Sequence, residues 1–244
     1  MDRSTHRREF LAAAFGTAGW ALGNSAQAQT PAKQPQQGMK LSLSVRVAEN
    51  FDNKRESSMT IDELITVAKS NGYQALCMRA SQAGIHTPAE TIEAMSEKIH
   101  GAGLAVSMVT GDFHVPQNDE HGPDGLRNIT PYLDLAEAFG ADLIRICMKK
   151  PEDIEWAQQA ADEARERDIR LAHQSHDATI FETIEGSLDV LRKVGRANFG
   201  LIYEPANWMI VDEPYGRDTI HKLRDYIFNV YVQNHRLNPD AEAR

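Results

Sequence analysis

Short apolar runs alternate with longer amphipathic segments from residue 41 to the end of the chain. A run of four to eight mostly apolar residues is typical of a strand buried in a parallel sheet, whereas apolar residues spaced three or four apart indicate a helix. The pattern predicts strands at residues 41–47, 74–80, 104–110 and 142–148, from residue 169, and at 199–204 and 229–235. Between them it predicts helices at residues 60–72, 87–101, 130–139, 152–167, 179–196 and 219–226.

Capping signals support two of these helices. Thr60 and Glu63 have the spacing of a capping box, in which each side chain bonds the backbone N–H of the other residue. Pro88 stands near the start of the second helix, and Gly103 follows its end, where a glycine is a common terminator.

Strands that alternate with helices form a parallel α/β sheet, so the remaining choice is between a doubly wound sheet and a barrel. No glycine-rich phosphate loop follows the first strand, and polar side chains occur at the carboxyl end of nearly every strand. These two features favour a (β/α)8-type TIM barrel. Only seven strands are predicted before Arg244, so the barrel is expected to be incomplete, with its eighth strand missing.

The first 38 residues differ from the rest. Arg7 and Arg8 precede an apolar stretch of about twelve residues, which is too short to span a bilayer. The sequence Ala26-Gln27-Ala28 then has the A-x-A pattern of a cleavage site. We therefore expect a twin-arginine-type signal peptide at residues 1–28, a flexible linker at 29–38 and a barrel domain at 39–244. The mature protein is expected in the periplasm, with no membrane attachment after cleavage.

Composition excludes one class of partner and one kind of stabilisation. The chain of 244 residues has a formal net charge of -9 and no basic stripe, so we expect no nucleic-acid binding. Its two cysteines, Cys77 and Cys147, both lie in apolar strand-like runs and are predicted to be buried thiols rather than a disulfide.

Candidate chemistry gathers at the ends of the last three strands. Alternate residues of a strand share a face, which places Gln174 and His176 together on one strand, with Glu204 and His235 at matching positions on the next two. Their oxygen and nitrogen donors suit a divalent metal ion such as Mn, Mg, Co or Zn. Glu204, Gln174 and His235 are thus the predicted metal ligands. A structural salt bridge for Glu204 and a hydrogen-bonded loop position for each histidine are the alternatives.

Further residues are candidates for binding a substrate. The Trp208 indole offers an apolar face for a sugar ring, and the Asn207 amide can bond its hydroxyl groups. His173 adjoins the same strand end, Asp112 and His114 follow the third strand, and Lys149 follows the fourth. Plain packing or solvated loop positions are the alternatives for these side chains.

The order of segments and the strand-end residues resemble the sugar phosphate isomerase/epimerase superfamily, whose members are xylose isomerase-like TIM barrels. The resemblance covers residues 40–237 and implies a metal held by Glu, Asp, His and a final Glu, with the two glutamates as an acid/base pair. It also implies a homodimer, since this family often pairs its barrels.

Several family positions are occupied differently here. The strand-five Glu falls on Gln174 and the following His on His176, while the strand-six Asp becomes Glu204 with Asn207 where a His would be. The strand-seven His and Asp fall on Tyr231 and Asn234, and the strand-eight Glu has no counterpart. Gln174 cannot act as a general base, which leaves Glu204 or His176 as the predicted catalytic residue, with a metal or Lys149 polarising the carbonyl.

The resemblance implies an isomerase- or epimerase-like enzyme that acts on a carbohydrate by metal-assisted proton transfer next to a carbonyl. Two alternatives stay open. One is a catalytically silent carbohydrate-binding relative, which Gln174 and Tyr231 favour. The other is a lyase that acts on a keto-sugar on the same scaffold.

Overall fold

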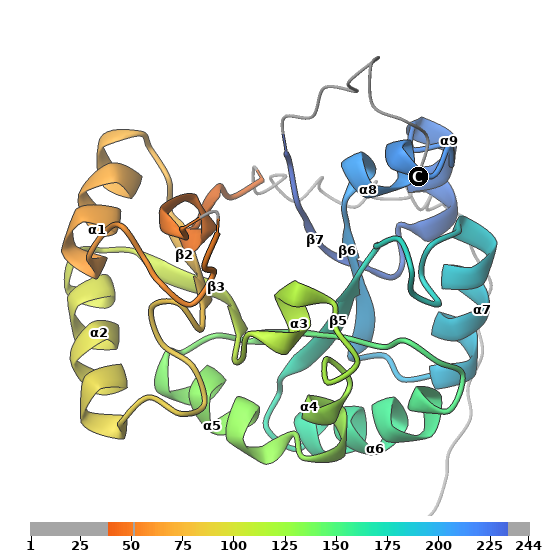
Figure 1. Ribbon diagram of the computed structural model, residues 1–244, viewed down its shortest axis with the longest axis horizontal. Helices are drawn as coiled ribbons and strands as arrows, with labels where there is room; N and C mark the ends of the chain where they lie inside the picture. Colours follow the sequence, from red (N-terminus) through yellow and green to blue (C-terminus); the bar gives the residue numbers. More distant parts are fainter. Residues whose placement is uncertain (1–38, 51, 234–244) are drawn as a thin grey trace, which may run out of the picture. The chain divides into compact units, whose positions relative to one another are not determined.

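The computed structural model describes residues 39–50 and 52–233. Their sheet has seven parallel strands, each paired with its neighbours in sequence, in the order β1 to β7 (Figure 1). The strands are β1 (Ser42–Ser44), β2 (Ala75–Arg79), β3 (Ala105–Thr110), β4 (Leu143–Ile146), β5 (Arg170–Gln174), β6 (Phe199–Tyr203) and β7 (Ile227–Val230). They form a half-barrel, so the prediction of an incomplete TIM barrel is confirmed.

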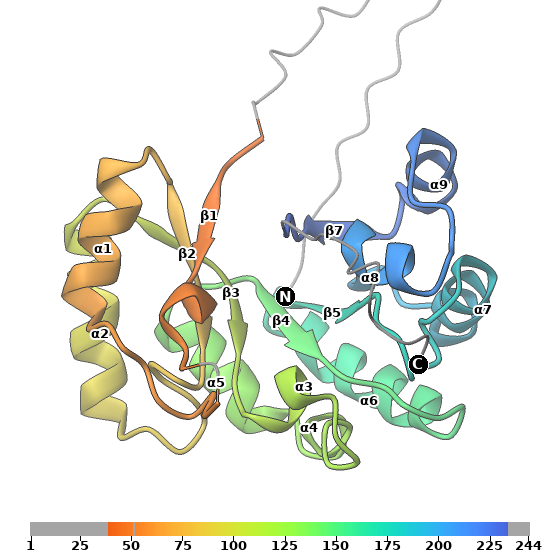
Figure 2. The same ribbon diagram turned by 45° about the horizontal axis from the view of Figure 1, so that its top comes forward.

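The helices lie outside the strands in an arc (Figure 2). The longer ones connect successive strands, and several short ones lie in the segments between a strand end and the next connecting helix. They are the 3-10 helix η1 (Val45–Ala48), α1 (Ile61–Ser70), α2 (Ala89–Gly101), α3 (His114–Gln117), α4 (Asp124–Arg127), α5 (Thr130–Ala138), α6 (Asp153–Arg165), α7 (Ile184–Val194), α8 (Pro205–Ile210) and α9 (Arg217–Leu223).

Each strand places alternate side chains in two different apolar layers. The larger layer lies between the sheet and the helices and contains residues of both, such as Ile144, Leu171 and Leu133. The smaller layer is built from strand residues and lies on the concave face: Cys77, Met108, Leu143, Ala172 and Ile202. Because side chains alternate along a strand, the residue two positions after each member of this layer also faces the barrel interior.

Local sequence explains where the main helices begin and end. The Thr60 hydroxyl accepts a hydrogen bond from the Glu63 N–H, and the Glu63 carboxylate accepts one from the Thr60 N–H, which confirms the predicted capping box. Thr183 caps α7 in a similar way, through the Gly186 N–H. That helix ends at Gly195, whose φ of 58° lies in the left-handed region that glycine enters at little cost.

The structure differs from the predicted pattern at four places. The first strand stops at Ser44 and continues as η1, and the last strand covers residues 227–230 rather than 229–235. The segment between the predicted strand at 104–110 and the predicted helix at 130–139 contains α3 and α4, and α8 follows β6 directly. Helices of four to six residues are too short to show a 3.6-residue periodicity, so the apolar pattern could not predict them.

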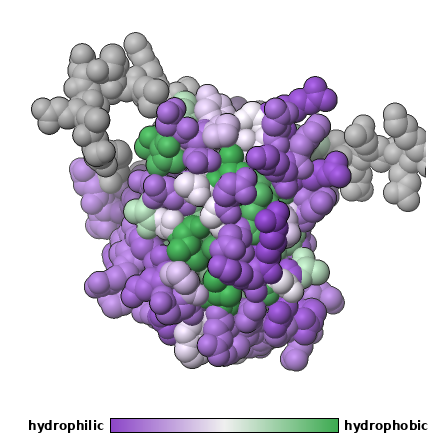
Figure 3. Space-filling view, turned by 90° about the vertical axis from the view of Figure 1, so that its right-hand side faces the viewer, coloured by the Kyte–Doolittle hydropathy of each residue, from purple (hydrophilic) through white to green (hydrophobic). Residues whose placement is uncertain are grey.

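The predicted signal peptide and linker lie outside the described residues. Within the described part of the chain, no helix is long and apolar enough to cross a bilayer. The side of the molecule on the right of Figure 1 is mostly hydrophilic, with separate hydrophobic patches (Figure 3). Both cysteines are free and buried, as predicted.

Candidate functional site

A polar cavity of about 130 Å³ lies at the carboxyl ends of the strands. Its lining comes from strand ends and from the segments that follow them, and includes η1, α3 and α8. The lining residues are Arg46, Lys54, Arg79, Pro116, Arg145, Gln174, His176, Asn207 and Gln233. Four of these nine side chains are arginine or lysine, and we call this space the cationic cavity.

The period of two along each strand brings the central residues of the site together. Cys77, Leu143 and Ala172 belong to the concave apolar layer. Arg79, Arg145 and Gln174 stand two residues further along the same strands and line the cavity. Glu204 stands in the same relation to Ile202 of β6. Apolar side chains thus close the interior below, and polar ones occupy its carboxyl end.

Glu204 is fully buried beside the cavity. Its Oε2 accepts a hydrogen bond of 3.1 Å from Asn207 Nδ2, and its Oε1 accepts one from Gln233 Nε2. Burial raises the pKa of Glu204 to about 7, against the opposing charges of Arg145 and Arg46. Glu204 is therefore a carboxyl group that changes its protonation near neutral pH.

Arg145 projects from β4 into the interior, with only 5% of its surface exposed. Burial lowers the pKa of its guanidinium. Its Nε has no hydrogen-bond partner among the described residues, and neither has Oε1 of the buried Gln174. One unpaired donor and one unpaired acceptor therefore belong to side chains that line the same cavity.

The other cations differ in how they are balanced. Arg79 forms a buried ion pair of 2.6 Å with Glu49. The pKa of Lys54 is lowered by burial and by the charges of Arg46 and Arg79, which shows that like charges crowd here. Among the described residues no acidic side chain forms an ion pair with Arg46, Lys54 or Arg145, so the cavity has excess positive charge.

His176 is the one predicted histidine that lines the cavity. Its Nδ1 lies 2.7 Å from the Asp177 carboxylate and 3.4 Å from Asn118 Nδ2. Lys149 lies close by, where its ammonium group donates to the Asn118 carbonyl at 2.7 Å. These two side chains are engaged with the loop that follows β3.

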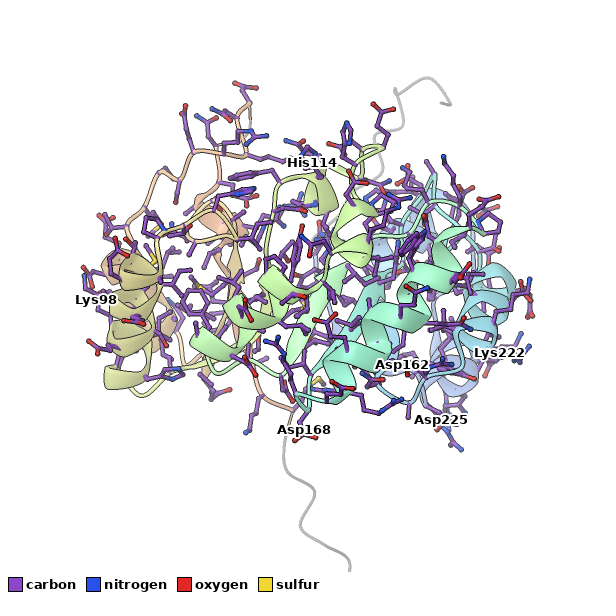
Figure 4. The ribbon with its side chains drawn as sticks, turned by 90° about the horizontal axis from the view of Figure 1, so that it is seen from below. Lys98, His114, Asp162, Asp168, Lys222 and Asp225 are labelled. Atoms are coloured by element: carbon purple, nitrogen blue, oxygen red, sulfur yellow. The ribbon has the colours of Figure 1, made fainter. Side chains whose placement is uncertain are left out.

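Asp112 and His114 have structural partners. The Asp112 carboxylate accepts hydrogen bonds from the Val115 N–H at 2.9 Å and from the Tyr132 hydroxyl, and it is buried. His114 pairs with Asp119 at 2.9 Å, and Figure 4 shows it on the side of the molecule opposite Asp168, the residue shortly before β5. Neither Asp112 nor His114 lines the cationic cavity.

His173 and Trp208 pack behind the sheet rather than in the cavity. The His173 ring stacks on Phe181 at a centroid distance of 4.2 Å, and burial lowers its pKa to about 3. Trp208 is fully buried, contacts the Tyr203 ring edge-on at 5.3 Å and donates through Nε1 to the Phe181 carbonyl. The predicted sugar-binding role does not fit this burial, because neither ring can reach a ligand. The position of His173 could be predicted, because successive side chains of a strand point to opposite faces and His173 directly precedes Gln174.

Sequence analysis missed the four cations and Gln233. Two of the cations left a readable signal. Arg145 interrupts the apolar run Leu143-Ile144-Arg145-Ile146, and Arg79 ends the run of β2. A charged residue inside an otherwise buried strand is costly without a compensating role, which marks such positions as candidates.

The described residues do not fit a divalent metal ion. In this part of the chain no group of three His, Cys, Asp or Glu side chains could hold one. Glu204 is the only predicted ligand with a negative charge, Gln174 offers a neutral amide, and His235 lies outside the described residues. Arg145 and Lys54 would repel a second cation from the same space.

Comparison with known proteins gives a family and several structural neighbours. The family model for the xylose isomerase-like TIM barrel matches residues 65–242. A xylose isomerase-like TIM barrel protein from Mycobacterium smegmatis, in complex with magnesium, is 16% identical with a TM-score of 0.64, over 81% of this chain and 75% of that one. D-allulose 3-epimerase from a Methylomonas species, in complex with D-allulose, is 16% identical with a TM-score of 0.58, over 79% of this chain and 71% of that one. The 3-keto-D-glucoside 4-epimerase of E. coli is 14% identical with a TM-score of 0.56, over 79% of this chain and 78% of that one. No curated protein matches the sequence.

At these identities the neighbours show a shared fold and nothing finer. The family match is broader evidence, since it spans most of the chain and runs from α1 past β7. It also agrees with the resemblance seen in the order of segments and in the strand-end residues. The chain belongs to the xylose isomerase-like TIM barrel family.

Proposed function

We propose that this chain is a sugar isomerase/epimerase-like enzyme that moves a proton at a carbon next to a carbonyl group, with Glu204 as the acid/base. The observation that carries the proposal is the buried carboxyl group at the end of β6, whose pKa is raised to about 7 beside a cationic cavity. A general acid/base works best when its pKa lies near the working pH, because both protonation states are then populated.

The neighbouring charges suit the second half of such a reaction. When Glu204 takes the proton, the C–H bond breaks and its electron pair passes into an enolate, whose oxygen becomes negative. The guanidinium of Arg145 and the ammonium of Lys54 line the adjacent cavity and can stabilise that oxygen. In this proposal they take the carbonyl-polarising role that the sequence analysis gave to a metal ion or Lys149.

Glu204 is the one carboxyl group that the described residues offer for this reaction, and this favours isomerisation over epimerisation. Isomerisation between neighbouring carbons can return the carbon-bound proton from the same face through Glu204 alone, while the hydroxyl proton passes between the two oxygens of the enediolate. Epimerisation needs a donor on the opposite face of the enolate, and Gln174 cannot supply a proton from there. His176, which also lines the cavity, is the remaining candidate for that second role.

Two side-chain amide groups cover the carboxylate of Glu204 and lie between it and a substrate. Asn207 and Gln233 each donate to one oxygen of the carboxylate, and the side chain has no exposed surface. A substrate carbon reaches Glu204 only after one amide has moved aside. This coverage also favours a second candidate function, a catalytically silent carbohydrate-binding relative that keeps the cavity and does no chemistry.

Exchange of carbon-bound hydrogen in D₂O tests the proposal. The protein is incubated with D-allulose, D-xylose or D-glucuronate, and deuterium incorporation next to the carbonyl is followed by NMR. We expect enzyme-dependent exchange with at least one sugar and a loss of roughly 100-fold or more in Glu204→Gln, consistent with removal of a general base. Glu155→Gln, which alters an exposed glutamate of α6, should exchange normally and serves as the matched control.

Two results would overturn parts of the proposal. Equal exchange rates in Glu204→Gln and the wild type would remove Glu204 from the acid/base role. Sugar binding without any exchange in the wild type would replace the enzyme by the carbohydrate-binding alternative. A lyase would instead eliminate water from the sugar, and the same spectra would show the resulting unsaturated product.

We also propose export to the periplasm and assembly as a homodimer, which rest on residues 1–28 and on the family resemblance. Fusing residues 1–38 to a reporter and blocking twin-arginine export tests the first. Light scattering of the purified protein tests the second, since it separates one chain of 27.2 kDa from two.

A further inference from the structure

The charge of the cationic cavity points to the kind of molecule that it holds. Arg46, Lys54, Arg79 and Arg145 come from four different segments and converge on a space of about 130 Å³. The described residues that line this space include no aspartate or glutamate. A neutral sugar needs hydrogen-bonding groups but no such concentration of positive charge.

The described residues neutralise only part of this charge. Glu49 balances Arg79 and also accepts a hydrogen bond from Ser81. Glu204 is a further acid beside the cavity on which the charges of Arg145 and Arg46 act, and its covered carboxylate accepts hydrogen bonds from two amides. Arg46, Lys54 and Arg145 therefore keep their charges without an ion-pair partner in the described part of the chain.

Two buried polar atoms at the cavity also have no hydrogen-bond partner among the described residues. They are Nε of Arg145, a donor, and Oε1 of Gln174, an acceptor, on side chains that are 5% and 4% exposed. An unsatisfied buried polar atom is costly, and such atoms in a cavity lining are normally satisfied by a ligand or water. A ligand that accepts from Arg145 and donates to Gln174 carries an oxyanion and a hydroxyl group close together.

A second cavity leaves room for the rest of such a molecule. This space of about 320 Å³ lies beside the first and shares Arg46, Arg79 and Gln233 with it. Tyr231 and Val232 contribute an apolar side to it. Gln233 lines both cavities and bonds Glu204, so a ligand extending from one cavity into the other passes the proposed acid/base.

We propose that the cationic cavity binds the anionic end of the substrate, and that the substrate is a sugar acid whose carboxylate lies against Arg145 and Lys54. A nearby hydroxyl group of the sugar donates to Gln174 Oε1. That the ligand is a substrate rests on the proposed function, whereas the binding of an anion does not. A phosphate group would offer the same oxyanion chemistry, so the test includes it as a separate probe.

Equilibrium binding, measured by calorimetry at about 150 mM salt, tests the site without any turnover. The probes are D-glucuronate, D-glucose as the neutral match, and inorganic phosphate. We expect D-glucuronate to bind roughly tenfold or more tightly than D-glucose, because charge-assisted hydrogen bonds are the stronger kind. Arg46→Gln and Lys54→Gln should each weaken D-glucuronate binding severalfold and weaken D-glucose binding less. Lys150→Gln, on an exposed lysine, is the matched control.

Several outcomes overturn the inference. Equal affinity for D-glucuronate and D-glucose, or equal effects of Lys54→Gln and Lys150→Gln, would show that the cavity does not select an anion. Binding of inorganic phosphate without binding of D-glucuronate would refute the proposal that the anionic group of the ligand is a carboxylate. Arg145→Gln serves only as a supplementary variant because its burial makes misfolding a separate cause of lost binding.

The same measurement separates this inference from the proposed function. Glu204→Gln removes a negative charge near the cavity and should bind D-glucuronate at least as tightly as the wild type does. Binding in that variant without proton exchange supports both proposals. Exchange on neutral sugars without selective binding of D-glucuronate would leave the function intact and refute the anionic substrate.

Discussion

Replacing Glu204 by glutamine should change how the stability of the protein depends on pH. The pKa of this carboxyl group is about 7 in the folded protein and 4.5 ordinarily, so the folded state binds the proton more tightly. The stability due to the protonated form is fully present below pH 4.5 and is lost as pH rises through 7. One pKa unit corresponds to about 1.4 kcal/mol, which gives a penalty of roughly 3 kcal/mol at alkaline pH. Glutamine keeps the shape and does not ionise, so the variant escapes this penalty.

Urea denaturation at pH 5 and pH 8 measures the effect. The difference in free energy of unfolding between Glu204→Gln and the wild type should shift in favour of the variant by about 2.5 kcal/mol between these two pH values. Titration of His173, whose folded pKa is about 3, contributes equally to both proteins and cancels. Glu155→Gln provides the control. An unchanged difference at the two pH values would show that burial does not perturb this carboxyl group.

Three further predictions concern the body of the fold. Trp208→Ala should lower the free energy of unfolding by about 3–5 kcal/mol in urea, because the indole is fully buried; a loss below about 1 kcal/mol would contradict its packing role. Burial raises the pKa of Cys147 to about 12 and also raises that of Cys77, so an aromatic disulfide reagent at pH 8 should label both thiols only after denaturation; rapid labelling of the native protein would refute this. Gly200→Ala should lower the melting temperature by several degrees, since a Cβ there would lie 2.5 Å from a backbone oxygen; an unchanged temperature would show that the strand can move.

The architecture could be predicted because it depends on periodicity. Seven apolar runs at regular spacing specify seven strands, and the intervening amphipathic segments specify helices, whatever the exact side chains. The helices that were not predicted have too few residues to show a periodic pattern. The segment α8 is an example: six residues after Glu204 begin with Pro205, whose missing N–H and fixed φ suit the first turn of a helix.

The candidate site was predicted less well, because histidine and acidic residues at strand ends are typical of a metal site and the cavity is lined by cations instead. Histidine and acidic residues attracted attention at strand ends, although strand parity already assigned His173 to the face opposite Gln174. Trp208 was predicted to bind a sugar ring, but α8 turns its indole into the core. Arginines are usually exposed, and only the folded sheet shows that Arg79 and Arg145 line one cavity.

Gln174, one of the departures from the family pattern, changes the charge of this site. A glutamate at position 174 would supply an anionic acceptor next to Arg145, in the interior that both side chains share. With Gln174 there, the Arg145 Nε has no acceptor and the amide oxygen has no donor among the described residues. The neutral amide and the unpaired Nε belong to the same cavity, whose excess positive charge disfavours the cation that the resemblance implies and suits an anion. Its complement is a ligand that carries the carboxylate which the protein lacks, with a hydroxyl group for the amide that replaced it.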